Sequence, residues 1–211
     1  MHDVAQRLVK RHGATFAEDA GINLRDKPSP LWRLLVLSLL LSARIASDIA
    51  VASARELSAA GWRTPKAILD STWQQRVDAL GRGGYRRYDE RTARQLSEAA
   101  DLVRTRWYGD LRRLHAEADG STTRAGELLQ AFTGIGPAGA AIFLREAQAV
   151  WPDMRPYVDD LAKKGADRLG LPTDPGDLYD TVGHADFHRL VIGCVRAVRD
   201  DDVVSDVLGR S

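Results

Sequence analysis

The stretch LLQAFTGIGPAGAAIFLREAQAVWPDMRPYVDDLAKKGADRLGL, residues Leu128 to Leu171, joins a helix, a glycine turn, a second helix and a valine–aspartate step. Apolar residues recur at helical spacing before the turn and predict the first helix. Gly134 and Gly136 permit positive φ and leave no Cβ that would hold a ligand away from the backbone. Pro137 suits the first position of the second helix, whose N–H groups would face an anion. The alternative is a tight corner between two helices, without a ligand.

Five segments of the chain carry a resemblance to a known family. They are Gly134 to Ala141 (GIGPAGAA), Val158-Asp159, Arg168 to Leu171 (RLGL), Leu39 to Arg44 (LLLSAR) and Gly83 to Arg87 (GGYRR), the last leading into a helix expected to end near Trp107. In their order along the chain, these segments resemble the helix-hairpin-helix DNA glycosylase superfamily, in particular the endonuclease III and adenine-mismatch glycosylase group. The resemblance spans about residues 30 to 172, which is most of the chain.

The resemblance implies an all-α, two-lobed glycosylase fold with a DNA cleft between the lobes. The expected divisions are an N-terminal segment of residues 1–30, a helical barrel-like lobe of residues 31–140 that includes the hairpin turn, and a C-terminal lobe of residues 141–211. The N-terminal segment is expected to pack with the C-terminal lobe. In that lobe, residues 172–176 predict a turn-rich interruption, and residues 200–202 predict a solvated turn.

Composition independently favours an all-α protein. The chain has 211 residues, 44% of them hydrophobic, so it can bury a substantial core. Strand signals are sparse, and long segments rich in Ala, Leu, Arg and Glu are separated by Gly and Pro. Leu34 to Leu41 is apolar on nearly every side and predicts a central buried helix. Only ten residues separate Arg33 from Arg44, too few to span a bilayer.

Two sequence features bear on the cellular location. The N-terminus lacks the basic, apolar and small-residue succession of a secretory signal, and the single Cys194 excludes an internal disulfide. We therefore expect a cytoplasmic, nucleoid-associated monomer that does not bind membranes.

The net charge of +1 gives no general basic surface, so contacts with DNA would need local patches. Two groups of arginines are candidates, with acidic residues among them: Arg82, Arg86, Arg87, Arg91 and Arg94, then Arg104, Arg106, Arg112 and Arg113. Such groups either face phosphates or form a solvated helix surface.

Asp159 is the candidate catalytic residue. In the family, the aspartate of the Val-Asp step stands beside the flipped nucleotide, where it stabilises the cationic sugar that develops as the base leaves or helps to activate the nucleophile. The resemblance gives Asp159 this role. A carboxylate near a developing oxocarbenium ion is most effective where water is excluded. In the alternative, Asp159 caps the helix Leu161 to Leu169, and one residue can serve both roles.

The chain also departs from the family pattern. Ala138 stands where strand-cutting members carry a lysine whose amine forms a Schiff base with the sugar. Because alanine cannot be a nucleophile, the resemblance implies either a monofunctional glycosylase that uses water or a protein without catalysis. Lys163, four residues after Asp159, predicts a surface or ion-pair lysine, with a relocated catalytic amine as the alternative.

No metal or other resident cofactor is expected. Many relatives hold an iron–sulfur cluster on four cysteines, which Cys194 alone cannot do. His184 and His188 have the spacing of one helix face and could share a metal with Asp180, but a partly exposed pair of helix histidines is the preferred interpretation. Related hairpins bind a monovalent cation through carbonyls, for which the nearest candidates are Thr133 and Ile135.

The resemblance assigns DNA contacts to the hairpin residues Gly134, Ile135, Gly136, Ala138 and Gly139. Base-excision enzymes rotate the target nucleotide out of the stack and fill the gap with a side chain. Arg44 matches the position where relatives carry a gap-filling polar residue, and an ordinary helix-end arginine is the alternative. Aromatic residues that either stack on a base or pack internally are Tyr85, Trp107, Tyr108, Trp151 and Tyr157.

These residues predict a DNA-repair protein whose partner is double-stranded DNA with a damaged or mismatched base. The leading hypothesis is a monofunctional DNA N-glycosylase that flips the base and hydrolyses the N-glycosidic bond with Asp159. The alternative is a non-catalytic damage-recognition or DNA-binding protein, which Ala138 and the missing cysteines favour and Asp159 opposes. A third hypothesis is a lyase that uses another amine. The excised base is not predicted, because its pocket would combine side chains from both lobes.

Overall fold

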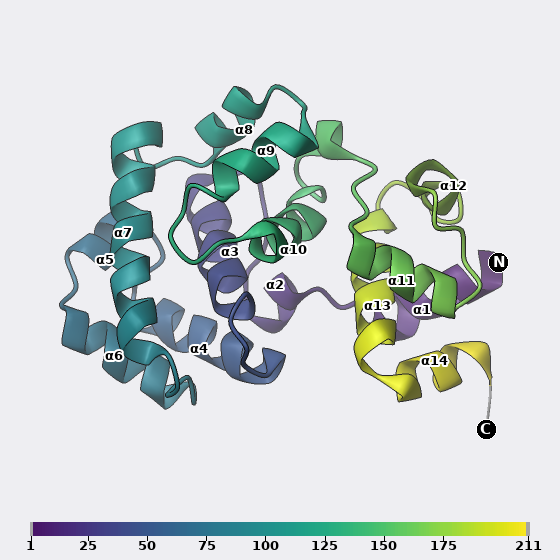
Figure 1. The fold of residues 1–211 in the computed structure, drawn as a ribbon, viewed down its shortest axis with the longest axis horizontal. Coiled ribbons are helices and arrows are strands. Elements are labelled where there is room, and N and C mark those ends of the chain that lie inside the picture. The colour runs from purple at the N-terminus through teal and green to yellow at the C-terminus, as the bar shows by residue number, and fades with distance from the viewer. Residues whose placement is uncertain (1, 210–211) are drawn as a thin grey trace. The chain divides into compact units, whose positions relative to one another are not determined.

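The structure, a computed structural model, describes residues 2–209 and contains no strand within that range (Figure 1). The prediction of an all-α protein is therefore confirmed. The helices are α1 (His2–His12), α2 (Phe16–Asp19), α3 (Pro28–Leu41), α4 (Ser47–Ala59), α5 (Pro65–Leu69), α6 (Trp73–Arg82), α7 (Asp89–Trp107), α8 (Arg112–Ala118), α9 (Thr122–Leu129), α10 (Pro137–Ala147), the 3-10 helix η1 (Pro152–Met154), α11 (Asp160–Arg168), α12 (Pro175–Tyr179), α13 (Phe187–Arg199) and α14 (Asp201–Leu208).

The chain forms two compact units. The large unit is Phe16–Leu144, and the small unit joins Met1–Thr15 to Arg145–Ser211. The sequence predicts divisions after residues 30 and 140 instead. The first boundary comes earlier because the segment after α2 belongs with α3: the guanidinium of Arg33 donates to the Gly21 carbonyl at 3.0 Å.

In the large unit, α3 is the buried central helix that its sequence predicts. It opens with Pro28, and Leu34, Leu37 and Leu40 are fully enclosed. The helix α4 packs on α3, α6 on α4, and both α5 and α6 pack on α7. The long helix α7 ends at Trp107, as predicted, and is followed by Tyr108 in the left-handed conformation.

A buried arginine ties α5, α6 and α7 together. Arg76, on α6, is 5% exposed and donates to the carbonyls of Ala93 at 2.9 Å, Ile68 at 3.1 Å and Ser71 at 2.8 Å. The last two carbonyls lie at the end of α5, where helix geometry leaves oxygens without an intrahelical donor. Arg76 therefore adds charged donors to this helix end and joins it to α7 through the Ala93 carbonyl.

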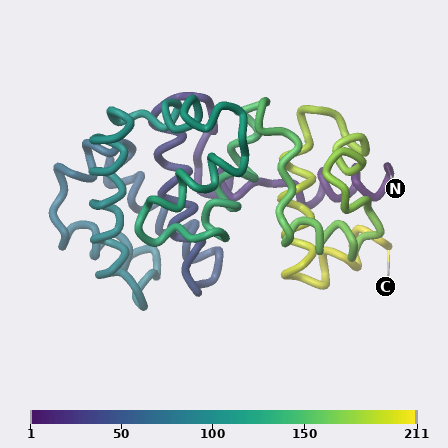
Figure 2. The backbone as a smooth tube through the Cα atoms, turned by 45° about the horizontal axis from the view of Figure 1, so that its top comes forward, coloured from purple at the N-terminus to yellow at the C-terminus, as the bar shows by residue number. Residues whose placement is uncertain are grey.

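In the small unit, α13 packs against α11, α1 and α14, and both Figure 1 and Figure 2 show the N-terminal helix lying beside it. Two glycines allow the close approaches. A Cβ on Gly165 would come within 1.8 Å of the Cys194 carbonyl oxygen, and a Cβ on Gly193 within 2.7 Å of the Leu8 side chain. Cys194 is fully buried in this packing, and its burial raises the pKa of its thiol to about 12.

Of two turns predicted from the sequence, the one over residues 172–176 is present only as far as Asp174, and the one over residues 200–202 is wrong. Residues 175–179 form the short helix α12, whose N-terminus is capped by the Asp174 carboxylate through Gly176 N–H at 2.8 Å. Asp200 likewise caps α14 by accepting from Asp202 N–H at 2.9 Å. In both cases a capping aspartate starts a helix where its polarity suggests a solvated turn.

No helix in residues 2–209 combines the length and the apolar character needed to cross a bilayer.

Candidate functional site

The helix, turn and helix predicted from the sequence are present. The turn of residues 130–136 joins α9 to α10, and Pro137 is the first residue of α10, as predicted. The turn is closed by a hydrogen bond from Ile135 N–H to the Phe132 carbonyl, 3.0 Å long, and α10 begins with Ala140 N–H donating to the Gly136 carbonyl, also at 3.0 Å. We call residues 130–139 the hairpin.

The two turn glycines differ in their physical roles. Gly134 has a φ of +94°, and a Cβ there would lie 2.6 Å from the side-chain amide nitrogen of Gln95, on α7. Gly136 is not among the glycines of positive φ, and a Cβ built on it meets nothing within 4 Å. Gly134 therefore adopts the positive φ that the sequence permits, whereas Gly136 does not and is instead the residue with open space in front of it.

Gly139 brings two predicted segments together. A Cβ on it would lie 2.3 Å from the hydroxyl of Ser42, in the LLLSAR segment at the end of α3. That hydroxyl donates to the Ser38 carbonyl at 2.6 Å, which fixes its position. A glycine is needed here for helix packing, whereas Ala138 beside it is exposed.

Below the turn, Phe132 packs on Trp107, with ring centroids 5.5 Å apart. The Trp107 indole N–H donates to Glu117 at 2.9 Å, and Arg106 bonds the other oxygen of that carboxylate at 2.8 Å. The hydrogen bond from Arg106 is the largest cause, followed by that from Trp107, and together they hold the pKa of Glu117 below its usual range. Glu117 therefore links α8 to the end of α7 that supports the hairpin.

Several hairpin amides remain open to a ligand. Among residues 2–209, the N–H groups of Gly134 and Gly136 find no hydrogen-bond acceptor. Ala138 and Gly139 lie in the first turn of α10, where N–H groups have no intrahelical acceptor. Gly134, Gly136 and Ala138 are exposed, while Ile135 and Gly139 are buried. An anion can reach the first three, and the two buried residues shape the turn.

The candidate stacking and gap-filling residues separate by exposure. Tyr85, Trp107 and Trp151 are enclosed and pack internally, whereas Tyr108 is 77% exposed, with the Arg113 guanidinium 4.8 Å from its ring centroid. Arg44 is exposed and lies in the bend between α3 and α4.

The two arginine groups differ in their partners. In the second group, Arg104 pairs with Asp101 at 2.5 Å and Arg112 with Asp110 at 2.6 Å. In the first group, four exposed arginines form no salt bridge within the described part of the chain: Arg86 and Arg87 in the loop before α7, and Arg91 and Arg94 in α7 itself. Arg87 and Arg91 both lie over the ring of Tyr88, at 5.2 and 5.4 Å from its centroid. We call these four the arginine patch.

Asp159 is the N-cap of α11, as the alternative interpretation predicts. Its Oδ1 accepts from Ala162 N–H at 3.2 Å. Its Oδ2 lies 3.4 Å from Nη2 of Arg145, and the side chains of Asp159 and Arg145 are 15% and 4% exposed, respectively. Both carboxylate oxygens are thus engaged, but one edge of the group still reaches the surface.

Sequence reasoning missed two residues of this site. Arg145 contacts the Asp159 carboxylate, and Gln148 binds the backbone of the segment that leads to Asp159. Gln148 is fully buried; its amide nitrogen donates to the Tyr157 carbonyl at 3.0 Å, and its amide oxygen accepts from Tyr157 N–H at 3.1 Å. Burial lowers the pKa of Arg145, and the charge of Asp159 opposes this. Burial, and then Asp159, raises the pKa of Tyr157 to about 12. The sequence feature that could have indicated Arg145 and Gln148 is a group of polar residues at the end of an apolar helix: Arg145, Glu146 and Gln148.

Lys163 does not pair with Asp159. Its backbone N–H donates to the Asp159 carbonyl at 2.9 Å, but its amine forms no salt bridge within residues 2–209. Lys163 is therefore a surface lysine, and the counter-ion of Asp159 is Arg145.

The proposed helix face with two histidines does not exist. Asp180 ends α12, His184 lies in the turn before α13 and bonds the Tyr179 hydroxyl, and His188 lies within α13. The chain turns between them, so helical spacing does not apply. In the part of the chain that the structure describes, no three His, Cys, Asp or Glu residues form a group suited to a metal ion.

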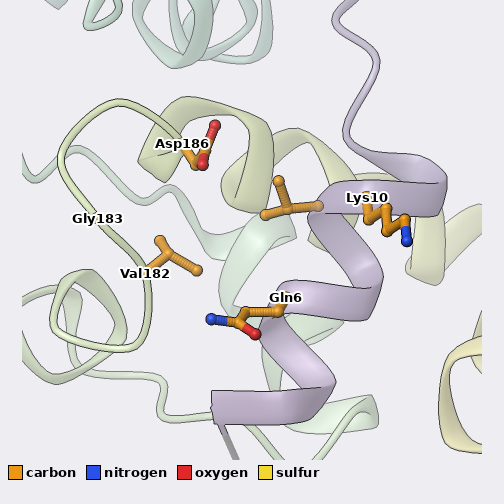
Figure 3. A pocket seen from close by; sticks show the side chains of 6 residues that line it. Gln6, Lys10, Val182, Gly183 and Asp186 are labelled. Atoms are coloured by element: carbon orange, nitrogen blue, oxygen red, sulfur yellow. The ribbon is translucent and has the colours of Figure 1, made fainter.

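A surface cavity of about 250 Å³ lies in the small unit (Figure 3). Its lining comes from α1 and from the turn before α13, namely Gln6, Val9, Lys10, Val182, Gly183 and Asp186. None of the predicted site residues contributes to it.

The predicted site residues are divided between the units. Arg44 and the residues of the hairpin lie in the large unit, and Asp159 lies in the small unit with Arg145 and Gln148. Comparison of the chain with protein-family models, with curated proteins and with solved structures gave no match.

Proposed function

We propose that this chain is a monofunctional DNA N-glycosylase with the two-lobed helix-hairpin-helix fold, acting on double-stranded DNA that contains a damaged or mismatched base. The observation that carries the proposal is the state of Asp159. Its carboxylate has one oxygen on the α11 N-terminus and the other beside Arg145, yet its side chain remains 15% exposed. A fixed, partly buried carboxylate suits the stabilisation of a developing sugar cation.

The hairpin supports the DNA-binding half of the proposal. The unpartnered N–H groups of Gly134 and Gly136 and the N-terminus of α10 suit a backbone phosphate. The carbonyls of Thr133 and Ile135 accept no hydrogen bond within residues 2–209, so they fit a monovalent cation, which would add positive charge next to that phosphate. The arginine patch supplies further cations, which form no salt bridge with another side chain of residues 2–209.

The proposed reaction uses water as the nucleophile. The bond between C1′ of the flipped nucleotide and its base breaks, the base leaves with the electron pair, and Asp159 stabilises the cationic sugar. Water then adds its hydroxyl to C1′, and its proton balances the charge on the departing base. The product is an abasic site in an intact strand, because Ala138 offers no amine for a Schiff base.

A second candidate is a non-catalytic DNA-binding or damage-recognition protein. One observation favours it: the guanidinium of Arg145, 3.4 Å from Asp159, offsets part of the attraction of the carboxylate for a sugar cation. In this candidate the hairpin and the arginine patch bind DNA, and Asp159 only caps α11.

The test is incubation of the purified protein with duplexes that carry uracil, alkylated, oxidised or mismatched bases, each analysed with and without hot alkali. Strand breaks that appear only after alkali support the glycosylase and identify its base. Breaks without alkali, together with borohydride trapping of the protein on abasic DNA, would indicate a lyase. Binding without any product across the panel supports the non-catalytic candidate.

A further inference from the structure

Two polar side chains near the end of α10 hold the segment that carries Asp159. Arg145 and Gln148 are three residues apart, which puts them on one side of the helix. They are 3% and 0% exposed. Arg145 contacts the Asp159 carboxylate. Gln148 forms hydrogen bonds with the backbone N–H and carbonyl of Tyr157, which lies two residues before Asp159.

The Gln148 contacts fix the backbone. Its amide nitrogen also donates to the Arg145 carbonyl at 3.1 Å, so one side chain joins the end of α10 to Tyr157 on the following segment. A buried amide with its donors and its acceptor used in this way has little freedom to move.

Packing alone does not explain Arg145. Its Nε has no hydrogen-bond partner within residues 2–209, and its salt bridge to Asp159 is long, at 3.4 Å. A buried charge in this condition is costly, and apolar residues of similar volume often replace buried ion pairs without loss of stability. A function for the charge at this position is the simplest explanation.

We infer that Arg145 is the positioning residue of Asp159, with Gln148 supporting it through the backbone of Tyr157. The inference rests on the proposed catalytic role of Asp159. Ala162 N–H binds Oδ1, and the Arg145 guanidinium lies 3.4 Å from Oδ2, so the two contacts together favour one orientation of the carboxylate before DNA binds. Loss of Arg145 lets the group rotate, and a displacement of about 1 Å in a catalytic group costs about 100-fold in rate.

The first experiment measures single-turnover base excision and, separately, affinity for the same lesion duplex. Arg145→Met is expected to slow excision about 100-fold with affinity changed by less than about twofold. Arg145→Lys keeps the charge without the planar fork and is expected to lose about tenfold. Arg168→Met is the matched control, because Arg168 also lies in the small unit but bonds the Ala197 carbonyl, at 2.7 Å, and Asp201. Its rate is expected to equal that of the wild type.

The second experiment needs no activity. Amide hydrogen exchange at Ala162 is expected to be at least about tenfold faster in Arg145→Met, because the acceptor on Asp159 is no longer held. Exchange at Tyr157 is expected to rise in the same way in Gln148→Leu. If the wild type excises no base, the proposed function fails, and the exchange data still decide whether Arg145 orders Asp159.

The outcome that overturns the inference is a wild-type excision rate, or wild-type exchange at Ala162, in folded Arg145→Met. If that variant does not fold, Arg145→Lys carries the same test, and a wild-type rate in it overturns the inference. Equal losses of rate in Arg145→Met and Arg168→Met also overturn it, since they would indicate a general loss of stability.

Discussion

The backbone of Gly134 lies directly against the side-chain amide of Gln95, where a Cβ would come within 2.6 Å of the amide nitrogen. Gly134 also has a φ of +94°, which side chains rarely adopt. Gly134→Ala is therefore expected to lower the free energy of unfolding of the large unit by about 1–3 kcal/mol. Urea denaturation followed by circular dichroism measures this change.

Two substitutions of Gly136 complement Gly134→Ala: Gly136→Ala is the matched control for stability, and Gly136→Val tests DNA binding. Because a Cβ there meets nothing within 4 Å, Gly136→Ala should change stability by less than about 0.5 kcal/mol. Gly136→Val is expected to keep the fold, since the added Cβ meets nothing within 4 Å, and it places a branched side chain where a phosphate would approach. Its affinity for duplex DNA should fall irrespective of sequence; unchanged affinity at moderate salt would remove the hairpin from the binding surface.

Replacing the buried Arg76 is expected to change the stability of the large unit. Arg76→Met removes a buried charged donor from the carbonyls of Ile68, Ser71 and Ala93, so the free energy of unfolding should drop by about 2–4 kcal/mol. Arg76→Lys should fall between wild type and Arg76→Met, because one ammonium group cannot span all three oxygens. Arg94→Met, at an exposed position, should be nearly neutral. A stable Arg76→Met would show that water replaces these bonds at little cost.

The lowered pKa of Glu117 predicts that the stability of the protein decreases at acidic pH. Hydrogen bonds from Arg106 and Trp107 lower its pKa in the folded protein, so its contribution to stability is complete above the ordinary glutamate pKa of about 4.3. That contribution is lost as the pH falls through the lowered value. The difference in urea midpoint between wild type and Glu117→Gln should therefore be largest near neutral pH and shrink towards pH 3. A constant difference over this range would mean that the carboxylate charge is irrelevant.

The arginine patch predicts how binding depends on salt. Replacing Arg86 and Arg87 with glutamine should weaken binding to undamaged duplex and reduce the slope of log affinity against log salt by about 1 for each phosphate that the variant no longer neutralises. Arg104→Gln is the control, since Arg104 already pairs with Asp101 at 2.5 Å. Equal slopes in all variants would place the DNA elsewhere.

Local sequence patterns predicted much of the fold. The buried helix around Leu37, the start of α10 at Pro137 and the cap of α11 by Asp159 are each decided by neighbouring residues, and each is confirmed. The short helix after Asp174 was missed because an aspartate followed by proline and glycine is typical of turns as well as of helix starts.

The candidate site was less predictable because its contacts are long-range. No local pattern indicates that Gln95 lies against Gly134, or that Ser42 lies under Gly139. Helical spacing suggested Lys163 as the partner of Asp159, but a buried arginine from the preceding helix pairs with it instead. Burial decides this pairing, and a single sequence does not show which polar residues are buried.

The most direct test of the proposed function compares wild type with Asp159→Asn on the lesion duplex that the panel identifies, measuring single-turnover excision and affinity for that duplex. Asparagine keeps the N-cap of α11 but removes the negative charge. We predict that excision is lost, by at least about 100-fold, while affinity for the lesion is retained. Excision at the wild-type rate in folded Asp159→Asn would contradict the catalytic role of this residue.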